Sequence, residues 1–265
     1  MDFIKILGTR GSLPVCGADY ARYGGATTCV LAYLGGQYLV LDAGSGILNL
    51  PEEALAQMTL PLLLTHPHVD HLLGLPMCPY VMRRGARLDI YSKPRGGLSP
   101  REQVERLISP PLWPIRTDGF LTELEFHNLP ETMQLGAVRV DTMEGNHPGG
   151  VSLLRLEAGG KRVVFATDCT ISDALRPRLI DFARDCDLLL VDGQYTAEEW
   201  PSHSTFGHST WRTAAELGRV CGAKRLRIVH HDPQHTDAML APLDAALQAE
   251  EPAFRFAREG ETVEL

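Results

Sequence analysis

The feature that most limits how this chain can fold is a short segment that crowds three histidines and an aspartate together. Directly after an apolar run, the sequence reads Thr65-His66-Pro67-His68-Val69-Asp70-His71, in a chain with 10 histidines among 265 residues. Because Pro67 disfavours helical geometry at His66, this part should be extended, and side chains two apart in an extended segment project to the same side. His66 and His68 can then bind one cation, while Asp70 and His71, beyond a change of backbone direction, serve a second. The competing interpretation is a polar, solvated loop.

The apolar run before this segment predicts a buried strand, and similar short runs recur along the chain. We expect strands at residues 3–7, 29–34, 38–41, 60–64, 88–91, 138–142, 151–156, 162–167, 188–191 and 226–229. We expect helices at residues 71–84, 99–108, 173–183, 209–220 and 237–249. Hairpins are followed by helix-separated strands in both halves, which predicts an α/β fold with two packed sheets and helices outside, a four-layer αββα sandwich. No repeat or linker divides the chain, so residues 1–265 should form one domain, with an insert or flap at 92–118.

Three further candidate ligands lie just past the carboxyl ends of predicted strands. These are His147, Asp168 and His230. Loops at strand ends of a layered fold can converge on one edge, so these side chains can join the first segment. Taken singly, each has an ordinary explanation, as a turn histidine, a helix-capping aspartate or a core histidine. Their joint placement favours a shared metal site.

The order of these residues resembles the metallo-β-lactamase superfamily, and the resemblance covers essentially the entire chain. The matching pattern is His66-x-His68-x-Asp70-His71, followed by His147, Asp168 and His230. The resemblance implies an αββα sandwich with a dinuclear site at one sheet edge. It implies that the first metal is held by His66, His68 and His147. It implies that the second is held by Asp70, His71 and His230, with Asp168 as the bridging ligand. Imidazole and carboxylate suit two divalent ions, with zinc first and manganese, iron or nickel also open.

Asp42 stands in the segment Leu41-Asp42-Ala43-Gly44, which matches the first motif of that superfamily. The resemblance implies that Asp42 orients the histidine segment. The alternative is an aspartate that bonds its own backbone in a turn.

Three other segments resemble the ribonuclease Z and phosphodiesterase branch of the superfamily. They are Gly8-Thr9-Arg10-Gly11-Ser12-Leu13-Pro14, Arg22-Tyr23-Gly24-Gly25 and Phe206-Gly207-His208-Ser209-Thr210. In that branch a histidine in a His-Ser-Thr segment is thought to protonate the leaving group, with an acidic residue in support. The resemblance assigns these two roles to His208 and Asp192. Together with the expected metal ligand Asp70, they are the catalytic candidates. Without the resemblance, His208 would be interpreted as a residue at the start of a helix.

The chemistry of such a site points to phosphate esters. Two divalent ions with two carboxylates and one bridging hydroxide leave a net charge of about +1, which favours a phosphodiester monoanion. Metal binding also lowers the pKa of water from about 15.7 to about 7. We therefore predict a phosphodiesterase that uses a metal-bridging hydroxide on a small phosphodiester, for example a cyclic nucleotide.

Other functions compete with this prediction. The first alternative is a tRNA 3'-processing endonuclease, similar to ribonuclease Z. The formal charge of -8, from 25 basic and 33 acidic residues, disfavours a nucleic-acid partner without excluding it. Residues 92–118 also do not resemble the long arm with which that family grips tRNA. A non-catalytic metal-binding regulatory protein and a glyoxalase-II-like thioesterase are further alternatives. We expect Arg10, residues 92–118 and the 193–207 loop to form the walls of the substrate pocket.

The sequence also bears on location and partners. No apolar run approaches the roughly 18–20 residues that span a bilayer. Residues 1–7 lack the pattern of a signal peptide, and the six cysteines are scattered without a C-x-x-C pair. We therefore expect a cytoplasmic protein with a small-molecule substrate and no membrane partner. The resemblance also allows a homodimer.

Overall fold

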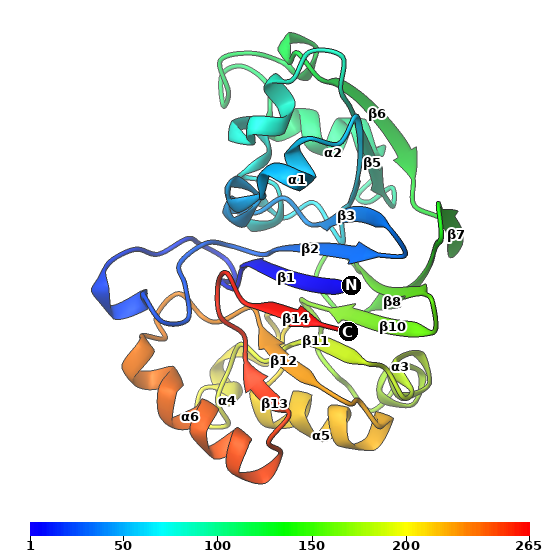
Figure 1. The fold of residues 1–265 in the computed structure, drawn as a ribbon. Coiled ribbons are helices and arrows are strands. Elements are labelled where there is room, and N and C mark those ends of the chain that lie inside the picture. Colours follow the sequence, from blue (N-terminus) through cyan, green and yellow to red (C-terminus); the bar gives the residue numbers. More distant parts are fainter.

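Two seven-stranded β-sheets pack face to face in the computed structural model, which describes all 265 residues, and helices cover both outer surfaces (Figure 1). The strand order is β14-β1-β2-β3-β4-β5-β6 in the first sheet and β13-β12-β11-β10-β9-β8-β7 in the second. The αββα sandwich that the sequence predicts is therefore confirmed.

Each half of the chain supplies most of one sheet. The first sheet contains β1 (Phe3–Gly8), β2 (Cys29–Leu34), β3 (Gln37–Leu41), β4 (Thr59–Leu63), β5 (Arg87–Ser92), β6 (Glu123–Asn128) and β14 (Thr262–Glu264). The second contains β7 (Thr132–Leu135), β8 (Val138–Gly145), β9 (Val151–Ala158), β10 (Lys161–Ala166), β11 (Leu188–Asp192), β12 (Leu226–Val229) and β13 (Phe254–Phe256). The last strand crosses back to the first half, because β14 pairs with β1.

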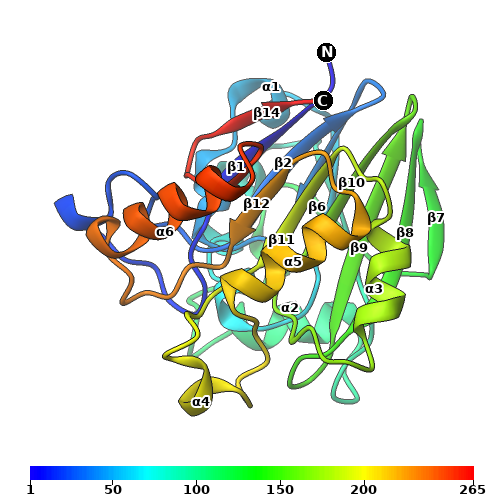
Figure 2. The same cartoon turned by 90° about the horizontal axis from the view of Figure 1, so that it is seen from below.

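The helices form the two outer layers. Their bounds are α1 (Glu52–Leu55), α2 (Pro100–Leu107), α3 (Arg176–Ala183), α4 (Trp200–His203), α5 (Trp211–Cys221) and α6 (Asp237–Glu250). Figure 2 shows α3, α5 and α6 over the second sheet, with α4 set apart in the loop between β11 and α5. None of the helices has the length and apolar content to cross a membrane.

Strand β2 shows how the sequence builds these layers. Side chains alternate between the two faces of a strand. Cys29 and Leu31 pack into the core beneath the helices of the first half, whereas Val30 and Ala32 pack into the core between the sheets. A third core lies beneath the helices of the second half. Strand β2 is therefore covered on both of its faces.

Strand directions bring the candidate site residues to one edge. Strand β10 runs parallel to β11, and β11 runs parallel to β12. Strand β8 has the same direction, because β9 pairs antiparallel with both β8 and β10. In the first sheet β3 and β4 are parallel. Within each sheet, the loops that follow these parallel strands therefore lie at the same edge. In open α/β sheets, ligands bind at this carboxyl-terminal edge.

The helix predicted at 71–84 is wrong. The structure has three short 3-10 turns instead, at Val69–His71, Leu75–Met77 and Pro79–Met82. Pro76 and Pro79 explain the difference, because a proline lacks the backbone N–H and clashes with the preceding turn of a helix.

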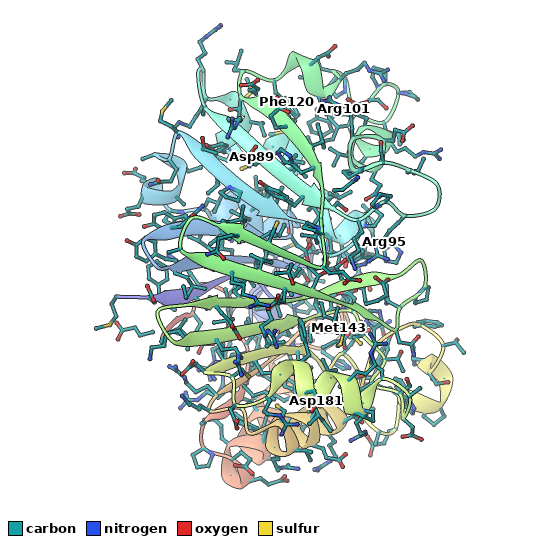
Figure 3. The ribbon with its side chains drawn as sticks, turned by 90° about the vertical axis from the view of Figure 1, so that its right-hand side faces the viewer. Asp89, Arg95, Arg101, Phe120, Met143 and Asp181 are labelled. Carbon is teal, nitrogen blue, oxygen red and sulfur yellow. The ribbon has the colours of Figure 1, made fainter.

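Residues 92–118 contribute to the outer layer of the first half. Helix α2 begins as the sequence predicts, because Ser99 caps it and forms a capping box with Glu102. Val104 of α2 belongs to the core beneath this layer, as does Phe120, which lies at the same end of the molecule as Arg101 of α2 (Figure 3). The helix packs on β5 and β6, and Gln103 of α2 donates a hydrogen bond to the carbonyl of Lys93, just after β5.

Candidate metal centre

Three of the site residues have a left-handed backbone conformation and lie just after the end of a strand. Asp42 directly follows β3 with φ of 60°, Asp168 follows β10 after one residue with φ of 52°, and His230 directly follows β12 with φ of 63°. This conformation costs a non-glycine residue roughly 1 kcal/mol or more. Such strain tends to collect at functional sites, and here it lies where the side chains turn toward a common point.

The first group of converging side chains is the three-histidine cluster, formed by His66, His68 and His147. Their ligand atoms lie within 4.8 Å of one another. Nδ1 of His68 lies 3.1 Å from Nε2 of His147, which the loop after β8 supplies. His66 is buried, His147 is half-buried and His68 is exposed.

The second group is the carboxylate cluster, formed by Asp70, His71, Asp168 and His230, all of them buried. Nε2 of His71 lies 3.2 Å from Oδ2 of Asp168, and Nε2 of His230 lies 3.0 Å from Oδ1 of Asp168. Oδ2 of Asp70 lies 3.3 Å from both of these nitrogens. The structure thus brings together in two adjacent clusters all seven side chains that the sequence predicts as metal ligands.

Asp168 lies between the two clusters. Its Oδ1 is 3.8 Å from Nε2 of His66 and 3.9 Å from Nε2 of His147, in addition to its shorter distances to the carboxylate cluster. This is the location that a bridging ligand requires.

In His66, His71 and His147, the ring nitrogen that points away from the clusters has a hydrogen-bond partner. Nδ1 of His71 donates to Oδ2 of Asp42 over 2.8 Å. Thr65 donates its hydroxyl to the same carboxylate, and its oxygen lies 3.0 Å from Nδ1 of His66. Nδ1 of His147 donates to the carbonyl of Gly207 over 3.0 Å. Such outer partners fix the tautomer of a ligand histidine and aim its other nitrogen at the metal. The contacts of Asp42 agree with the orienting role that the resemblance implies.

Two nitrogens that face the clusters are left without a partner. Nε2 of His66 and Nε2 of His71 are buried and accept no hydrogen bond, although Asp168 lies close to both. Buried polar atoms are rarely unpaired in folded proteins. The donor set of imidazole nitrogens and carboxylate oxygens therefore fits a divalent cation, which would satisfy both atoms.

The charges within the clusters differ. Burial lowers the pKa of His66 and of His147, so both rings are neutral, which is the form that binds a cation. Burial alone would also lower the pKa of His230, but Asp168 and Asp70 oppose it and raise that pKa to about 10. Without a cation, His230 therefore carries a proton beside these carboxylates. A cation that binds there must displace this proton.

His208 and Asp192 form an acid–base pair at the same edge. Nδ1 of His208 donates to Oδ2 of Asp192 over 2.7 Å. The backbone N–H groups of Cys169, Gln194 and Ser209 also donate to the carboxylate, which ends β11. The His208 ring stacks on the His230 ring, with centroids 4.8 Å apart. The structure thus places both predicted catalytic residues beside the clusters.

A cavity of about 280 Å³ opens beside both clusters. Besides cluster residues and His208, its lining consists of Ser12, Pro148, Tyr195 and Phe206. The expected 193–207 loop thus contributes Tyr195 and Phe206, but residues 92–118 do not reach the cavity. No lysine or arginine lines it.

The expectation that Arg10 forms a pocket wall is wrong. Its side chain is fully buried and donates to the backbone carbonyls of Gly24, Asp232 and His235. Arg10 therefore ties the connection between β1 and β2 to the loop between β12 and α6.

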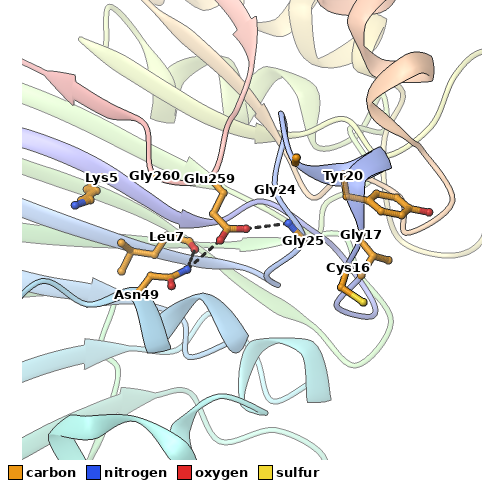
Figure 4. Close-up of a pocket in the computed structure, with 12 residues that line it drawn as sticks. Lys5, Leu7, Cys16, Gly17, Tyr20, Gly24, Gly25, Asn49, Glu259 and Gly260 are labelled. Atoms are coloured by element: carbon orange, nitrogen blue, oxygen red, sulfur yellow. Dashed lines mark hydrogen bonds between the residues drawn. The ribbon is translucent and has the colours of Figure 1, made fainter.

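A larger cavity, of about 500 Å³, lies elsewhere and contains none of the candidate ligands (Figure 4). Glu259 uses its carboxylate there to accept hydrogen bonds from the backbone N–H groups of Gly25 and Ala26 and from the side chain of Asn49. These bonds hold the turn before β14 against the N-terminal half, so the cavity is bordered by structural contacts.

One supporting residue was missed by the sequence analysis. Oε1 of Gln194 accepts a hydrogen bond from Nδ1 of His230 over 3.0 Å, and Nε2 of Gln194 donates to Oδ2 of Asp232 over 3.0 Å. The only signal for Gln194 in the sequence is its position two residues after Asp192. The remaining histidines join neither cluster. His231 is buried, and its Nε2 donates to the carbonyl of Ala257 over 2.9 Å.

Comparison with known proteins agrees with this geometry. Residues 39–231 match the family model described as "Beta-lactamase superfamily domain". Ribonuclease Z from Thermoplasma acidophilum is 34% identical over 92 residues, which are 35% of this chain and only 29% of that protein. Ribonuclease Z from Methanosarcina acetivorans is 26% identical, and the match covers 88% of each chain.

Two solved structures show the same fold over the whole chain. The metallo-β-lactamase fold protein YhfI from Bacillus subtilis has a TM-score of 0.75 at 19% identity and covers 100% of this chain and 99% of its own. A diphosphatase from the PhnP family has a TM-score of 0.71 at 18% identity, with coverage of 100% and 98%.

Proposed function

Because the chain belongs to the metallo-β-lactamase superfamily, we propose that it is a metal-dependent phosphodiesterase that hydrolyses a small phosphodiester beside the two clusters. One observation carries the proposal. Seven side chains suited to divalent cations and the acid–base pair of Asp192 and His208 meet beside a single cavity.

The three-histidine cluster would hold one cation and the carboxylate cluster a second, with Asp168 shared. Zinc is the cation that we propose, since imidazole nitrogens dominate the donor set. Two divalent cations would supply an activated water as the nucleophile and would offset negative charge on the phosphate. Asp70 and Asp168 neutralise only half of the charge of two such cations, so the site would attract an anionic phosphodiester.

His208 is the proposed general acid. Its Nδ1 is held by Asp192, its ring lines the cavity, and its Nε2 makes no hydrogen bond. The Asp192 carboxylate would stabilise the protonated imidazole and fix the ring so that Nε2–H faces the cavity. When the P–O bond to the leaving group breaks, that proton passes to the leaving oxygen. The oxygen of water forms the new bond to phosphorus.

The cavity supports a small substrate. Its volume of about 280 Å³ suits a compact diester, and its lining offers no lysine or arginine to a second phosphate. Long nucleic acids are held chiefly by clustered basic side chains. The formal charge of -8 adds to this argument.

Ribonuclease Z-like cleavage of RNA is the second candidate. The similarity to the enzyme from Methanosarcina acetivorans over 88% of both chains favours it. Cleavage of a precursor tRNA that weakens steeply with added salt would support this candidate over the small diester.

Hydrolysis of bis-p-nitrophenyl phosphate by the zinc-loaded protein tests the proposal. We expect turnover in the wild type and loss of turnover in Asp168→Ala. A glutathione thioester serves as the comparison substrate, because a glyoxalase-II-like thioesterase would favour it. If the folded, metal-loaded wild type hydrolyses no phosphodiester, the proposed function is wrong.

A further inference from the structure

Tyr195 has a hydrogen-bond donor that the protein itself does not use. The residue lines the cavity beside both clusters and is only 3% exposed. Its hydroxyl oxygen accepts a hydrogen bond from Nε2 of Gln194 over 3.2 Å, and no group of the protein accepts its proton. Buried polar groups rarely stay without a partner, so this donor is available to a molecule in the cavity.

We propose that Tyr195 is a further catalytic residue, whose hydroxyl donates a hydrogen bond to a non-bridging oxygen of the phosphate that is attacked. This inference rests on the proposed function, because it takes a phosphodiester as the substrate. It adds a contact to the phosphate that is separate from the proton donated by His208 to the leaving group.

The side chain of Gln194 cannot accept the proton of the Tyr195 hydroxyl. Its amide nitrogen donates to Oδ2 of Asp232 over 3.0 Å, and its amide oxygen accepts from Nδ1 of His230 over 3.0 Å. A carboxylate only accepts hydrogen bonds, so the amide nitrogen has to face Asp232. The same nitrogen contacts the Tyr195 oxygen. The amide therefore donates to the phenol and leaves the phenolic proton for another acceptor.

The backbone holds Tyr195 beside the proposed general acid. Its N–H donates to the carbonyl of Ser209 over 3.2 Å, and its carbonyl accepts from the N–H of Trp211 over 3.0 Å. The Tyr195 and His208 rings pack edge to face, with centroids 6.0 Å apart. The two side chains thus share one support at the cavity. A phosphate whose leaving oxygen lies at His208 can direct a non-bridging oxygen toward Tyr195.

The chemistry of a phenol suits this contact. Burial raises the pKa of Tyr195 above its ordinary value of about 10, so the hydroxyl keeps its proton at neutral pH. In phosphoryl transfer, negative charge is spread over the equatorial oxygens of the phosphoryl group. A hydrogen bond to a charged oxygen is stronger than one between neutral groups. The Tyr195 hydroxyl would therefore stabilise the transition state.

Tyr195→Phe tests the inference, because it removes the hydroxyl and keeps the ring. In the zinc-loaded protein, kcat/KM for a phosphodiester should fall at least about tenfold, the effect of losing one hydrogen bond to a charged group. Zinc content and far-ultraviolet circular dichroism should not change. Tyr33→Phe is the matched control, because Tyr33 pairs with Tyr38 at the start of β3, whereas Asp42 follows the other end of that strand.

The choice of leaving group separates a direct contact from an effect through His208. A donor to a non-bridging oxygen acts equally on all diesters, so the loss in Tyr195→Phe should be the same for an alkyl and an aryl leaving group. If Tyr195 served only to position His208, the loss would be larger for the alkyl group, which needs the proton more.

Sulfur substitution identifies the oxygen that Tyr195 contacts. Methyl p-nitrophenyl phosphorothioate has two stereoisomers, each with sulfur in place of one non-bridging oxygen. Sulfur is a weak acceptor of hydrogen bonds. The loss of kcat/KM in Tyr195→Phe should therefore remain for one stereoisomer and nearly disappear for the other. Equal losses for the two stereoisomers would overturn the direct contact.

Binding of inorganic phosphate gives a measurement that needs no turnover. Calorimetry on the zinc-loaded protein should show phosphate affinity at least about twofold lower in Tyr195→Phe, the lower end of the effect of one hydrogen bond. Tyr33→Phe should bind phosphate like the wild type.

The outcomes separate this inference from the proposed function. Unchanged kcat/KM and phosphate affinity in Tyr195→Phe, or a loss that depends on the leaving group, overturn the inference and leave the phosphodiesterase. Weaker phosphate binding in Tyr195→Phe, in a protein that hydrolyses no diester, supports the contact and overturns the proposed reaction. A folded wild type that binds neither zinc nor phosphate overturns both.

Discussion

Asp42 accepts a hydrogen bond from Nδ1 of His71 over 2.8 Å, and both side chains are fully buried. The same carboxylate accepts the N–H and hydroxyl of Thr65, whose oxygen lies 3.0 Å from Nδ1 of His66. One buried aspartate thus orients one histidine of each cluster.

Replacing Asp42 should weaken both clusters together. In Asp42→Ala we expect zinc retention to fall by about 10–100-fold, the usual effect of losing an outer partner. Zinc per chain after dialysis against chelator measures this. Asp19→Ala is the control, because Asp19 is exposed and remote from the ligands. Unchanged retention in Asp42→Ala would contradict the orienting role.

Removing the general acid should slow the reaction without removing metal. His208→Ala should lower kcat by about 10²–10⁴-fold, the range for general acid–base catalysis, with zinc content unchanged. The loss should be larger for an alkyl leaving group than for p-nitrophenolate, which needs less protonation. An equal loss for both leaving groups would argue against proton donation by His208.

Gly11 should tolerate no side chain. A Cβ at this position would lie 2.1 Å from Nδ1 and Cε1 of His230. Gly11→Ala should therefore displace His230 and reduce zinc retention in the carboxylate cluster. Gly119→Ala is the control, since its Cβ would lie 3.3 Å from Ile115 and far from the site. Full zinc content in Gly11→Ala would show that His230 is not a required ligand.

Phe206 should contribute to binding of aromatic substrates. Its ring lines the cavity, is 54% exposed, and is packed edge-on against His203 with centroids 5.1 Å apart. Stacking of a planar group on an aromatic side chain is worth about 1–3 kcal/mol. Phe206→Ala should raise KM for an aryl diester at least about fivefold, the lower end of that energy, with little change in kcat. In the same variant, KM for a dialkyl diester should stay constant. Leu112→Ala is the control, and its KM for each of the two diesters should equal that of the wild type.

Asp141 should support stability in mild acid. Burial alone would raise the pKa of Asp141, but hydrogen bonds from Arg155, Thr132 and Arg139 outweigh it and lower the pKa to about 2. A pKa lowered on folding stabilises the protein above the unfolded pKa of about 3.9, and this contribution is lost as the pH falls toward 2. Asp141→Asn should thus be less stable than wild type at pH 6, with a gap that narrows below pH 4.

Urea unfolding at several pH values measures this gap. A chelator is present throughout, so that loss of metal in acid does not contribute. Asp181→Asn is the control, because Asp181 is exposed on α3 (Figure 3). A gap that is constant between pH 6 and pH 2.5 would contradict the assignment.

The histidine segment could be recognised from the sequence because its information is local. A proline between two histidines and an abrupt end to an apolar run predict a loop of this kind without knowledge of the rest of the chain. Asp168 and His230 could be added because each stands at the end of a clear apolar run. Asp192 and His208 depended on resemblance, since neither residue alone differs from a turn aspartate or a helix-start histidine.

Other features depend on tertiary contacts that no local pattern shows. Gln194 supports His230 only because β11 and β12 are neighbours in the sheet. Strand β6 was missed because four of the six residues in its sequence, Glu-Leu-Glu-Phe-His-Asn, are polar and because it lies at the edge of the first sheet. Strands β13 and β14 have three residues each, too few for a periodic signal, and exist because a neighbouring strand pairs with them.

The left-handed backbone at Asp42, Asp168 and His230 lowers the conformational stability of the protein, whereas the side chains at these positions build the candidate metal centre. Glycine adopts this geometry without steric penalty, so it would relieve strain at these positions and at the same time remove the side chain that matters. A laboratory selection for heat resistance alone would thus reward the loss of the site. Directed evolution of this scaffold needs a turnover screen at every round.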